Sequence, residues 1–163
     1  MNFEIRNFEE SDFPAVKEIY QLGMDTGNAS FELVAPDWDY WNLKFLPQFR
    51  LVAVNENKIL GWVALMRVSS RVVLSGVCEV SVYVHPEEQG KGIGKKLMQE
   101  IISLSEANQI WTLQSGIFPE NQASIQLHLQ LGFRQVGIRE KFGKMNGRWR
   151  DVIFLERRSK LID

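Results

Sequence analysis

"EVSVYVHPEEQGKGIGKKLMQEI" occupies residues 79–101 and places a strand pattern, a glycine cluster and a helix pattern in direct succession. An apolar run over 72–84 predicts a strand that ends before Pro86, because proline cannot continue a sheet ladder. Apolar residues then recur at helical spacing and predict a helix over 92–107. Glycines between a strand and a helix often hold a phosphate, because they let the backbone approach an anion closely.

Three phosphate-binding patterns can be compared with this glycine cluster. A Walker loop requires Ser or Thr where Lys96 stands, and a dinucleotide fingerprint requires its third glycine at another spacing. The pattern Q/R-x-x-G-x-G/A is met, with amides at a helix start and a favourable helix dipole. The alternative is a glycine-rich turn that only starts a helix. The residues that we predict to hold a pyrophosphate are Gln89, Gly90, Lys91, Gly92, Ile93, Gly94 and Lys95.

The remaining segments alternate between helix and strand patterns. Asn146–Gly147 is a strong hairpin signal, and Gly76 predicts a bulge or a splay in its strand. No repeat or linker interrupts the chain, so we predict a single α+β domain over 1–163 with a mostly antiparallel sheet. Helices are expected over 11–24, 36–46, 92–107 and 121–133, and strands over 3–8, 49–54, 58–68, 72–84, 110–117, 134–144 and 148–157.

Composition excludes several classes of protein. Apolar residues make up 45% and charged residues 24% of the chain, as in ordinary globular proteins. No apolar run approaches the roughly 20 residues of a membrane-spanning helix, and the acidic first residues lack an apolar core, so we expect no membrane association and no secretory signal. Cys78 is the only cysteine, which fits a reducing, cytoplasmic location. With only His85 and His128 as histidines and no spaced carboxylate cluster, we expect no metal site.

The net charge of −1 conceals an asymmetry along the chain. Residues 1–60 hold ten acidic and five basic side chains, whereas residues 134–160 hold nine basic and three acidic ones. A basic end can bind nucleic acid. Here the charges alternate with apolar residues, as on the solvated face of paired strands, so we expect no nucleic-acid partner.

"N-x-x-S-I-x-L-x-x-x-L-G-F" over 121–133, together with the strand, glycine loop and helix, resembles the GCN5-related N-acetyltransferase superfamily. "NASFE" at 28–32 and "GKMNGRWRDVIFLER" at 143–157 resemble its phosphinothricin N-acetyltransferase branch. The resemblance implies a three-layer α/β/α fold, a central sheet flanked by about four helices, and acetyl-CoA as cosubstrate with its pyrophosphate in the glycine loop. It also implies a homodimer.

The chemistry of acetyl transfer suggests roles for several residues. Glu79 is a carboxylate among apolar residues, which costs free energy unless it is hydrogen-bonded or functional. By resemblance it acts as the base that deprotonates the acceptor amine; the alternative is a solvent-facing or loop-anchoring glutamate. Resemblance also assigns the thioester and pantetheine contacts to the backbone of Val82, Tyr83 and Val84, with Asn121 and Ser124 near the pantetheine.

Residues of the later helix and of two loops complete the expected site. His128 stands where many relatives place the acid that protonates the thiolate, and simple packing is an equal alternative. Arg71 matches an arginine of the branch and would bind the carboxylate of the acceptor, while Phe31 would wall its pocket. Leu74 replaces an aromatic residue of several relatives, so the acceptor is open to question. A covalent route through Cys78 is less favoured than a buried thiol.

These features predict an N-acetyltransferase that transfers acetyl directly from acetyl-CoA, in a ternary complex, to a small amino acid or analogue. Phosphinothricin, methionine sulfoximine and methionine sulfone are the acceptors that the resemblance suggests. A peptide N-terminal acetyltransferase and a non-catalytic acyl-CoA sensor are the alternatives, and the presence of Glu79 argues against the sensor.

Overall fold

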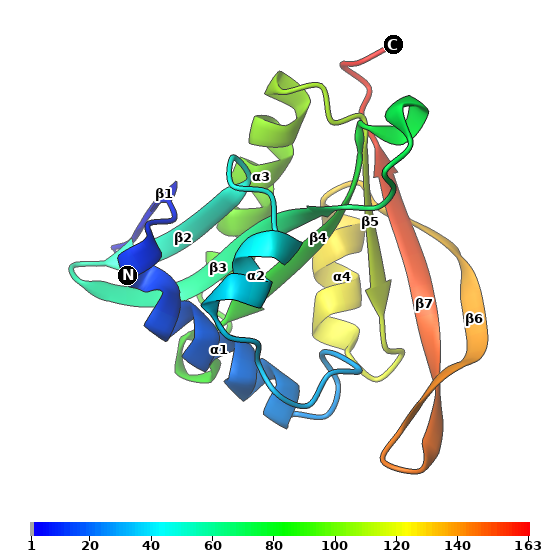
Figure 1. Ribbon diagram of the computed structural model, residues 1–163, viewed down its shortest axis with the longest axis horizontal. Helices are drawn as coiled ribbons and strands as arrows, with labels where there is room; N and C mark the ends of the chain where they lie inside the picture. Colours follow the sequence, from blue (N-terminus) through cyan, green and yellow to red (C-terminus); the bar gives the residue numbers. More distant parts are fainter. Residues whose placement is uncertain (1) are drawn as a thin grey trace.

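The structure, a computed structural model, describes residues 2–163, which form seven strands and four α-helices (Figure 1). The predicted order of elements is confirmed, with ends that differ by a few residues. The elements are β1 (Glu4–Asn7), α1 (Phe13–Asp25), α2 (Trp38–Lys44), β2 (Arg50–Asn55), β3 (Lys58–Arg67), β4 (Val77–Val84), α3 (Ile93–Ala107), β5 (Thr112–Ile117), α4 (Gln122–Gln130), β6 (Arg134–Met145) and β7 (Arg148–Arg158).

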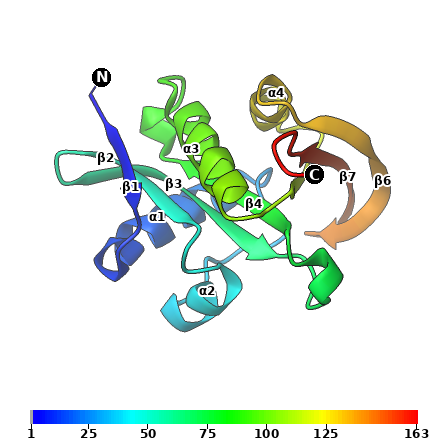
Figure 2. The same cartoon turned by 90° about the horizontal axis from the view of Figure 1, so that it is seen from above.

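The strands form one sheet in the order β1-β2-β3-β4-β5-β7-β6. Only the β4–β5 pair is parallel, and every other neighbouring pair is antiparallel. Helices α1 and α2 lie on one face of the sheet and α3 and α4 on the other (Figure 2). The predicted α+β, three-layer architecture is therefore confirmed.

One apolar cluster covers each face of the sheet. Cys78 and Val80 of β4 pack with the buried residues of α3 and α4, whereas α1 and Trp41 of α2 pack on the opposite face. Since side chains alternate along a strand, Glu79, Ser81 and Tyr83 point toward the α1–α2 layer. The strand thus divides its residues between two different environments.

The strand predicted over 72–84 begins only at Val77, so that prediction was wrong at its start. Residues 72–74 form a 3₁₀ turn instead. Gly76 stands just before the strand, where a Cβ would lie 2.0 Å from Cε3 of Trp111. Its carbonyl accepts hydrogen bonds from the amides of Trp111 and Thr112. Gly76 is therefore required by the close approach of β5 and not by a bulge within β4.

The splay in the sheet lies further along, between β4 and β5. These strands pair only at residues 77–79 and 112–114 and then diverge, while β4 stays paired with β3 without a register shift up to Val84. The divergence leaves one edge of β4 open beyond Glu79. At Val84 this edge lies close to Gly94 at the start of α3, which also approaches Leu127 of α4.

A wide bulge shapes β6 opposite Asp151. Arg139 pairs with Val152 and Gly143 with Arg150, so residues 140–142 face the single residue Asp151. The Asp151 carboxylate accepts a hydrogen bond from the amide of Lys141, whose φ is +46°. A Cβ on Gly143 would lie 2.5 Å from the ring of Phe31. The bulge and this glycine bring the hairpin against the loop that follows α1.

Candidate active site

The glycine loop has the geometry of an anion cradle. Gly90 and Gly92 adopt left-handed backbone conformations, with φ of +77° and +81°, and no atom lies within 4 Å of the Cβ position of either residue. Gly92 caps α3, and the first amides of a helix have no intrahelical partners. Gly94 lies close to Leu127 and Val84, so it brings the start of α3 against α4 and β4.

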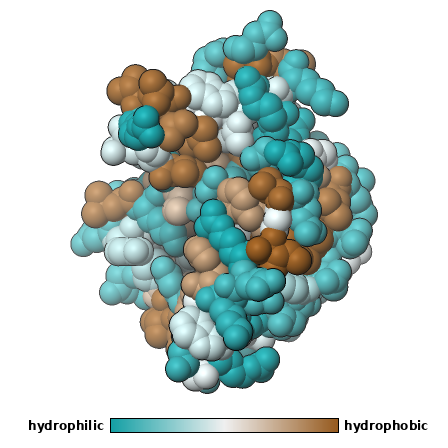
Figure 3. All heavy atoms as spheres, turned by 90° about the vertical axis from the view of Figure 1, so that its right-hand side faces the viewer, coloured by the Kyte–Doolittle hydropathy of each residue, from teal (hydrophilic) through white to brown (hydrophobic). Residues whose placement is uncertain are grey.

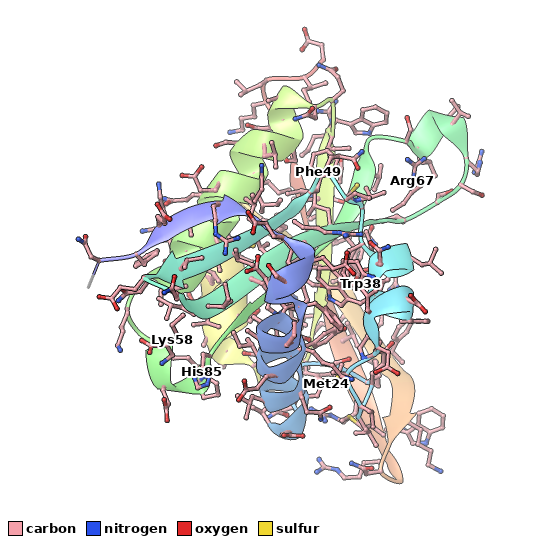
Figure 4. All side chains as sticks on the ribbon, turned by 60° about the vertical axis from the view of Figure 1, so that its left-hand side comes forward. Met24, Trp38, Phe49, Lys58, Arg67 and His85 are labelled. Carbon is pink, nitrogen blue, oxygen red and sulfur yellow. The ribbon has the colours of Figure 1, made fainter. Side chains whose placement is uncertain are left out.

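The lysine side chain at this loop is not free to bind an anion, because it is already paired with a carboxylate. The half-exposed Lys91 pairs with Glu88 at 2.7 Å, and Lys58 of β3 reaches the same carboxylate at 3.1 Å. Figure 4 places Lys58 and His85 together at one end of the sheet, with Arg67 at the other. Lys91 therefore helps to fix the loop, and its amide is the part left for an anion.

The open edge of β4 presents backbone groups at alternate residues. The His85 amide donates a hydrogen bond to the Leu60 carbonyl, and the Val68 amide donates one to the Val77 carbonyl. Since hydrogen-bonded pairs alternate along an antiparallel ladder, the odd-numbered residues of β4 form the backbone hydrogen bonds to β3. The amides of Val82 and Val84 consequently point toward the splay. The amide of Tyr83 points toward β3, so the expectation that all three amides line the splay is corrected for Tyr83.

Tyr83 instead contributes its ring to the α1–α2 side. The ring stacks on Trp62 with centroids 5.2 Å apart and meets Tyr20 at 4.8 Å. A Cβ on Gly23 would clash with it at 2.5 Å, so α1 is packed directly against this ring. Burial raises the pKa of Tyr83 well above its usual range, so the phenol stays neutral.

Glu79 is half-buried on the same face of β4, next to Met66 of β3 and Gln114 of β5. Burial raises the pKa of the Glu79 carboxyl, and the positive charges of Lys44 and Arg139 partly oppose that increase. The net rise brings the carboxylate closer to the range in which a base can accept a proton near neutral pH.

The two cations near Glu79 escaped the sequence-based reasoning. Lys44 ends α2; its ammonium donates to Tyr20 Oη at 3.2 Å and lies 3.9 Å from Glu32 Oε1. Arg139 lies on β6, with its guanidinium 4.9 Å from the ring centre of Phe142 and 4.7 Å from that of Phe154. Both are far from Glu79 in sequence, and no local pattern marks them.

His128 is buried, only 2% exposed, against Phe133. Its Nδ1 lies 2.7 Å from the carbonyl oxygen of Ser124, so Nδ1 carries a proton and donates it there. Nε2 is buried without a partner among the described residues. Burial lowers the pKa of His128. In the neutral ring Nε2 is an acceptor, so the predicted role as an acid requires protonation against this shift.

This burial predicts a pH dependence of stability. Because the folded-state pKa of His128 lies below its ordinary value, the unfolded chain binds the extra proton first as the pH falls. Burial of the neutral ring should therefore lower the free energy of unfolding as the pH falls below about 6.5. In His128→Gln the free energy of unfolding, measured with urea at about pH 7.5 and pH 5, should fall less on acidification than in the wild type. An equal or larger fall would contradict the neutral assignment.

Arg150 of β7 joins the loop after α1 to the loop before α4, and sequence reasoning missed it. It donates to the Gly27 carbonyl at 2.8 Å, to Asn28 Oδ1 at 2.9 Å and to Glu120 Oε2 at 3.2 Å. Asn121 connects the same loops, since its side chain donates to the Asn28 carbonyl and accepts from the Ser124 amide. The motif that contains Arg150 thus organises two loops of the site.

The two residues expected to bind the acceptor lie in different settings. Phe31 packs edge-on against Phe118 at 4.9 Å and lies 6.4 Å from Phe142, so it stands where the loop meets the hairpin. Arg71 starts the exposed turn between β3 and β4, at the end of β4 that holds Glu79. Its guanidinium forms no hydrogen bond or ion pair with residues 2–163.

The described residues give less support to a cysteine nucleophile, a metal site or a second pocket. Cys78 is fully buried, and burial raises the pKa of its thiol to about 11, which disfavours a thiolate. Among residues 2–163 no three His, Cys, Asp or Glu side chains are grouped as metal ligands. None of the described helices is long and apolar enough to cross a bilayer. A cavity of about 500 Å³ between α1 and the β2–β3 turn contains neither Glu79 nor the glycine loop.

Comparison with known proteins links this arrangement to one family. The family model described as Acetyltransferase (GNAT) family matches residues 5–133. A phosphinothricin N-acetyltransferase of Alcaligenes faecalis is 32% identical over 161 residues, which cover 94% of this chain and 81% of the relative.

Solved structures agree with the sequence comparison. A phosphinothricin acetyltransferase from Sinorhizobium meliloti in complex with acetyl-CoA superposes with a TM-score of 0.87, at 29% identity over 97% of this chain and 89% of its own. A ribosomal-protein-alanine N-acetyltransferase from Brucella melitensis gives a TM-score of 0.87, at 29% identity over 96% and 99%.

Proposed function

Since the chain belongs to the GNAT acetyltransferase family, we propose that it transfers acetyl from acetyl-CoA to the amino group of a small amino acid or analogue. The observation that supports this proposal most is the position of Glu79 on β4, beside an open strand edge and on the face opposite α3 and α4. The cosubstrate would enter from the splay and the acceptor from the α1–α2 side, so that the two meet at β4.

The cosubstrate half of the proposal uses backbone groups. The pyrophosphate would accept hydrogen bonds from the amides of residues 90–95, at the start of α3. The pantetheine arm would lie along the open edge of β4, where the amides of Val82 and Val84 are available to it and to the thioester oxygen. Asn121 and Ser124 would flank the arm from α4.

The reaction is a direct transfer in a ternary complex. Glu79, itself or through water, takes a proton from the ammonium of the acceptor, because only the free amine has a lone pair. The amine nitrogen attacks the thioester carbon, and a strand amide stabilises the charge that grows on the oxygen. The C–S bond breaks and CoA leaves as the thiolate. The attacking nitrogen then loses its extra proton to become the amide, and the thiolate takes up one proton, from that nitrogen through water or from a protein acid, to become the thiol. His128 can supply that last proton only when its ring is protonated.

The acceptor class rests on Arg71 and Phe31, and a pair of acceptors tests it. Arg71 can bind a carboxylate bidentately, and Phe31 forms an aromatic wall for a compact ligand. Arg71→Ala should raise KM for methionine sulfone about 10-fold or more, as expected for the loss of a charged hydrogen-bonded pair. The decarboxylated analogue, an amine of the same length, should show an unchanged KM. Equal changes for both compounds would remove Arg71 from the acceptor site.

Peptide N-terminal acetylation is the second candidate, and the likeness to the Brucella melitensis structure favours it. It requires an open groove beside Glu79. The contacts of Phe31 with Phe118 and Phe142 argue for a closed wall there. We therefore retain it as the alternative to be measured beside the amino acids.

We expect a homodimer. The β6–β7 hairpin exposes Ile138, Phe142 and Trp149, each more than half accessible, and Figure 3 shows apolar groups scattered over this side of the molecule. Light scattering at micromolar concentration should give twice the 18.8 kDa mass of the chain. Trp149→Ser should shift the equilibrium toward the monomer, because it removes an apolar ring from the surface. A monomer mass for the wild type would contradict the expectation.

A further inference from the structure

The cation Arg139 lies on the same face of the sheet as Glu79. Ile153 and Leu155 of β7 pack in the α3–α4 cluster, so Phe154 between them points toward the α1–α2 side. The Arg139 guanidinium stacks on Phe154, which places it on that side as well. Gly116 of β5 pairs with Phe154 of β7, so β5 has no side chain directly beside Phe154.

The guanidinium is held in place by aromatic rings. The bulge at residues 140–142 brings Phe142 over Arg139. The hydrogen bond from the Lys141 amide to the Asp151 carboxylate fixes the bulge. Phe142 also neighbours Phe31, the expected wall of the acceptor pocket. A continuous series of side chains therefore runs from Phe31 through Phe142 to Arg139 and Phe154.

Arg139 has no anionic partner among the described residues. Lys44, the other cation that acts on Glu79, already pairs with Glu32 and Tyr20. Arg139 forms no ion pair in residues 2–163. Its exposed side chain lies against two rings, which leaves the guanidinium accessible to a carboxylate or phosphinate that it can bind bidentately.

We propose that Arg139 is a specificity residue that binds an anionic group at the side-chain end of the acceptor. This inference rests on the proposed amino-acid acetylation and deepens it. With Arg71 on the α-carboxylate and Arg139 on the far end, the preferred acceptor is an amino acid with a second anionic group. An uncharged tetrahedral end would fill the same space without the ion pair.

Two acceptors of nearly equal shape test this proposal. Phosphinothricin ends in an anionic methylphosphinate, and methionine sulfone ends in a neutral methyl sulfone on a chain of the same length. Arg139→Gln should lower kcat/KM for phosphinothricin about 10- to 100-fold, as for one charged, hydrogen-bonded contact. For the sulfone, kcat/KM should change less than about 3-fold. Arg139→Lys should recover part of the lost activity.

Controls separate recognition from other effects of the substitution. Lys144→Gln removes a cation that stacks on Trp149 of the same hairpin and should leave both acceptors unchanged. Assays at about pH 9 keep Glu79 ionised in every variant, so any shift of its pKa does not contribute. An equal loss on both acceptors, or no loss on either, overturns the proposal. If the wild type acetylates neither compound, the amino-acid function itself is wrong and the role of Arg139 falls with it.

Discussion

Glu79→Gln should lower kcat by about 100- to 10,000-fold, the usual contribution of a general base. The amide keeps the shape of the side chain and cannot accept the ammonium proton. Because the pKa of Glu79 is raised, wild-type kcat/KM should increase with pH through that pKa and level off where the carboxylate is fully ionised. The variant should lose this limb. Initial rates of thiol release between about pH 5.5 and pH 9 measure both effects.

The affinity for acetyl-CoA distinguishes a lost base from a damaged site. Glu79 points to the α1–α2 side, away from the open strand edge, so the calorimetric Kd for acetyl-CoA should stay within about 3-fold of the wild type. Glu79→Asp should retain part of the rate. Wild-type kcat across the pH range in Glu79→Gln would show that the carboxylate is structural.

Gly92→Val should weaken acetyl-CoA binding by about 10- to 100-fold. The Cβ position at Gly92 is open, so the branched side chain enters the space where the pyrophosphate would lie. Loss of one or two hydrogen bonds from backbone amides to a charged phosphate corresponds to that change in Kd. Isothermal titration calorimetry with acetyl-CoA, and with CoA itself, gives the affinity directly.

Backbone strain has to be separated from this loss of contact. Gly92 has a φ of +81°, a conformation that valine rarely adopts, so the variant should also lose some stability. Gly147→Val is the matched control, because Gly147 has a φ of +78°, is equally open and lies in the β6–β7 turn. It should lose similar stability and bind acetyl-CoA normally. Equal affinities in both variants would remove the glycine loop from the cosubstrate site.

Features that depend on neighbours in sequence could be predicted. The glycine loop, the helix after it and the position of Glu79 in a buried strand all follow from local spacing within residues 79–101. The start of β4 could not be predicted, because Gly76 is required there by its contact with the ring of Trp111, a residue 35 positions away. The same limit explains the Tyr83 amide, whose direction depends on the pairing with β3.

Residues that act across elements were missed for a similar reason. Lys44 of α2 and Arg139 of β6 approach Glu79 only in the folded chain, since both are far from it in sequence. Arg150 lies in the motif at residues 143–157, and its partners Gly27, Asn28 and Glu120 become its neighbours only in the fold. Arg150 directly follows Trp149 in an alternating strand, and this is the one local signal that could have indicated such a role.

The most direct test is thiol release from acetyl-CoA by the wild-type protein with a matched panel of free amino acids, short peptides and polyamines. We predict that phosphinothricin or a related small amino acid gives the highest kcat/KM, at least about 10-fold above every peptide and polyamine. Faster acetylation of a peptide or a polyamine than of every amino acid would contradict the acceptor site described around Glu79, Arg71 and Phe31.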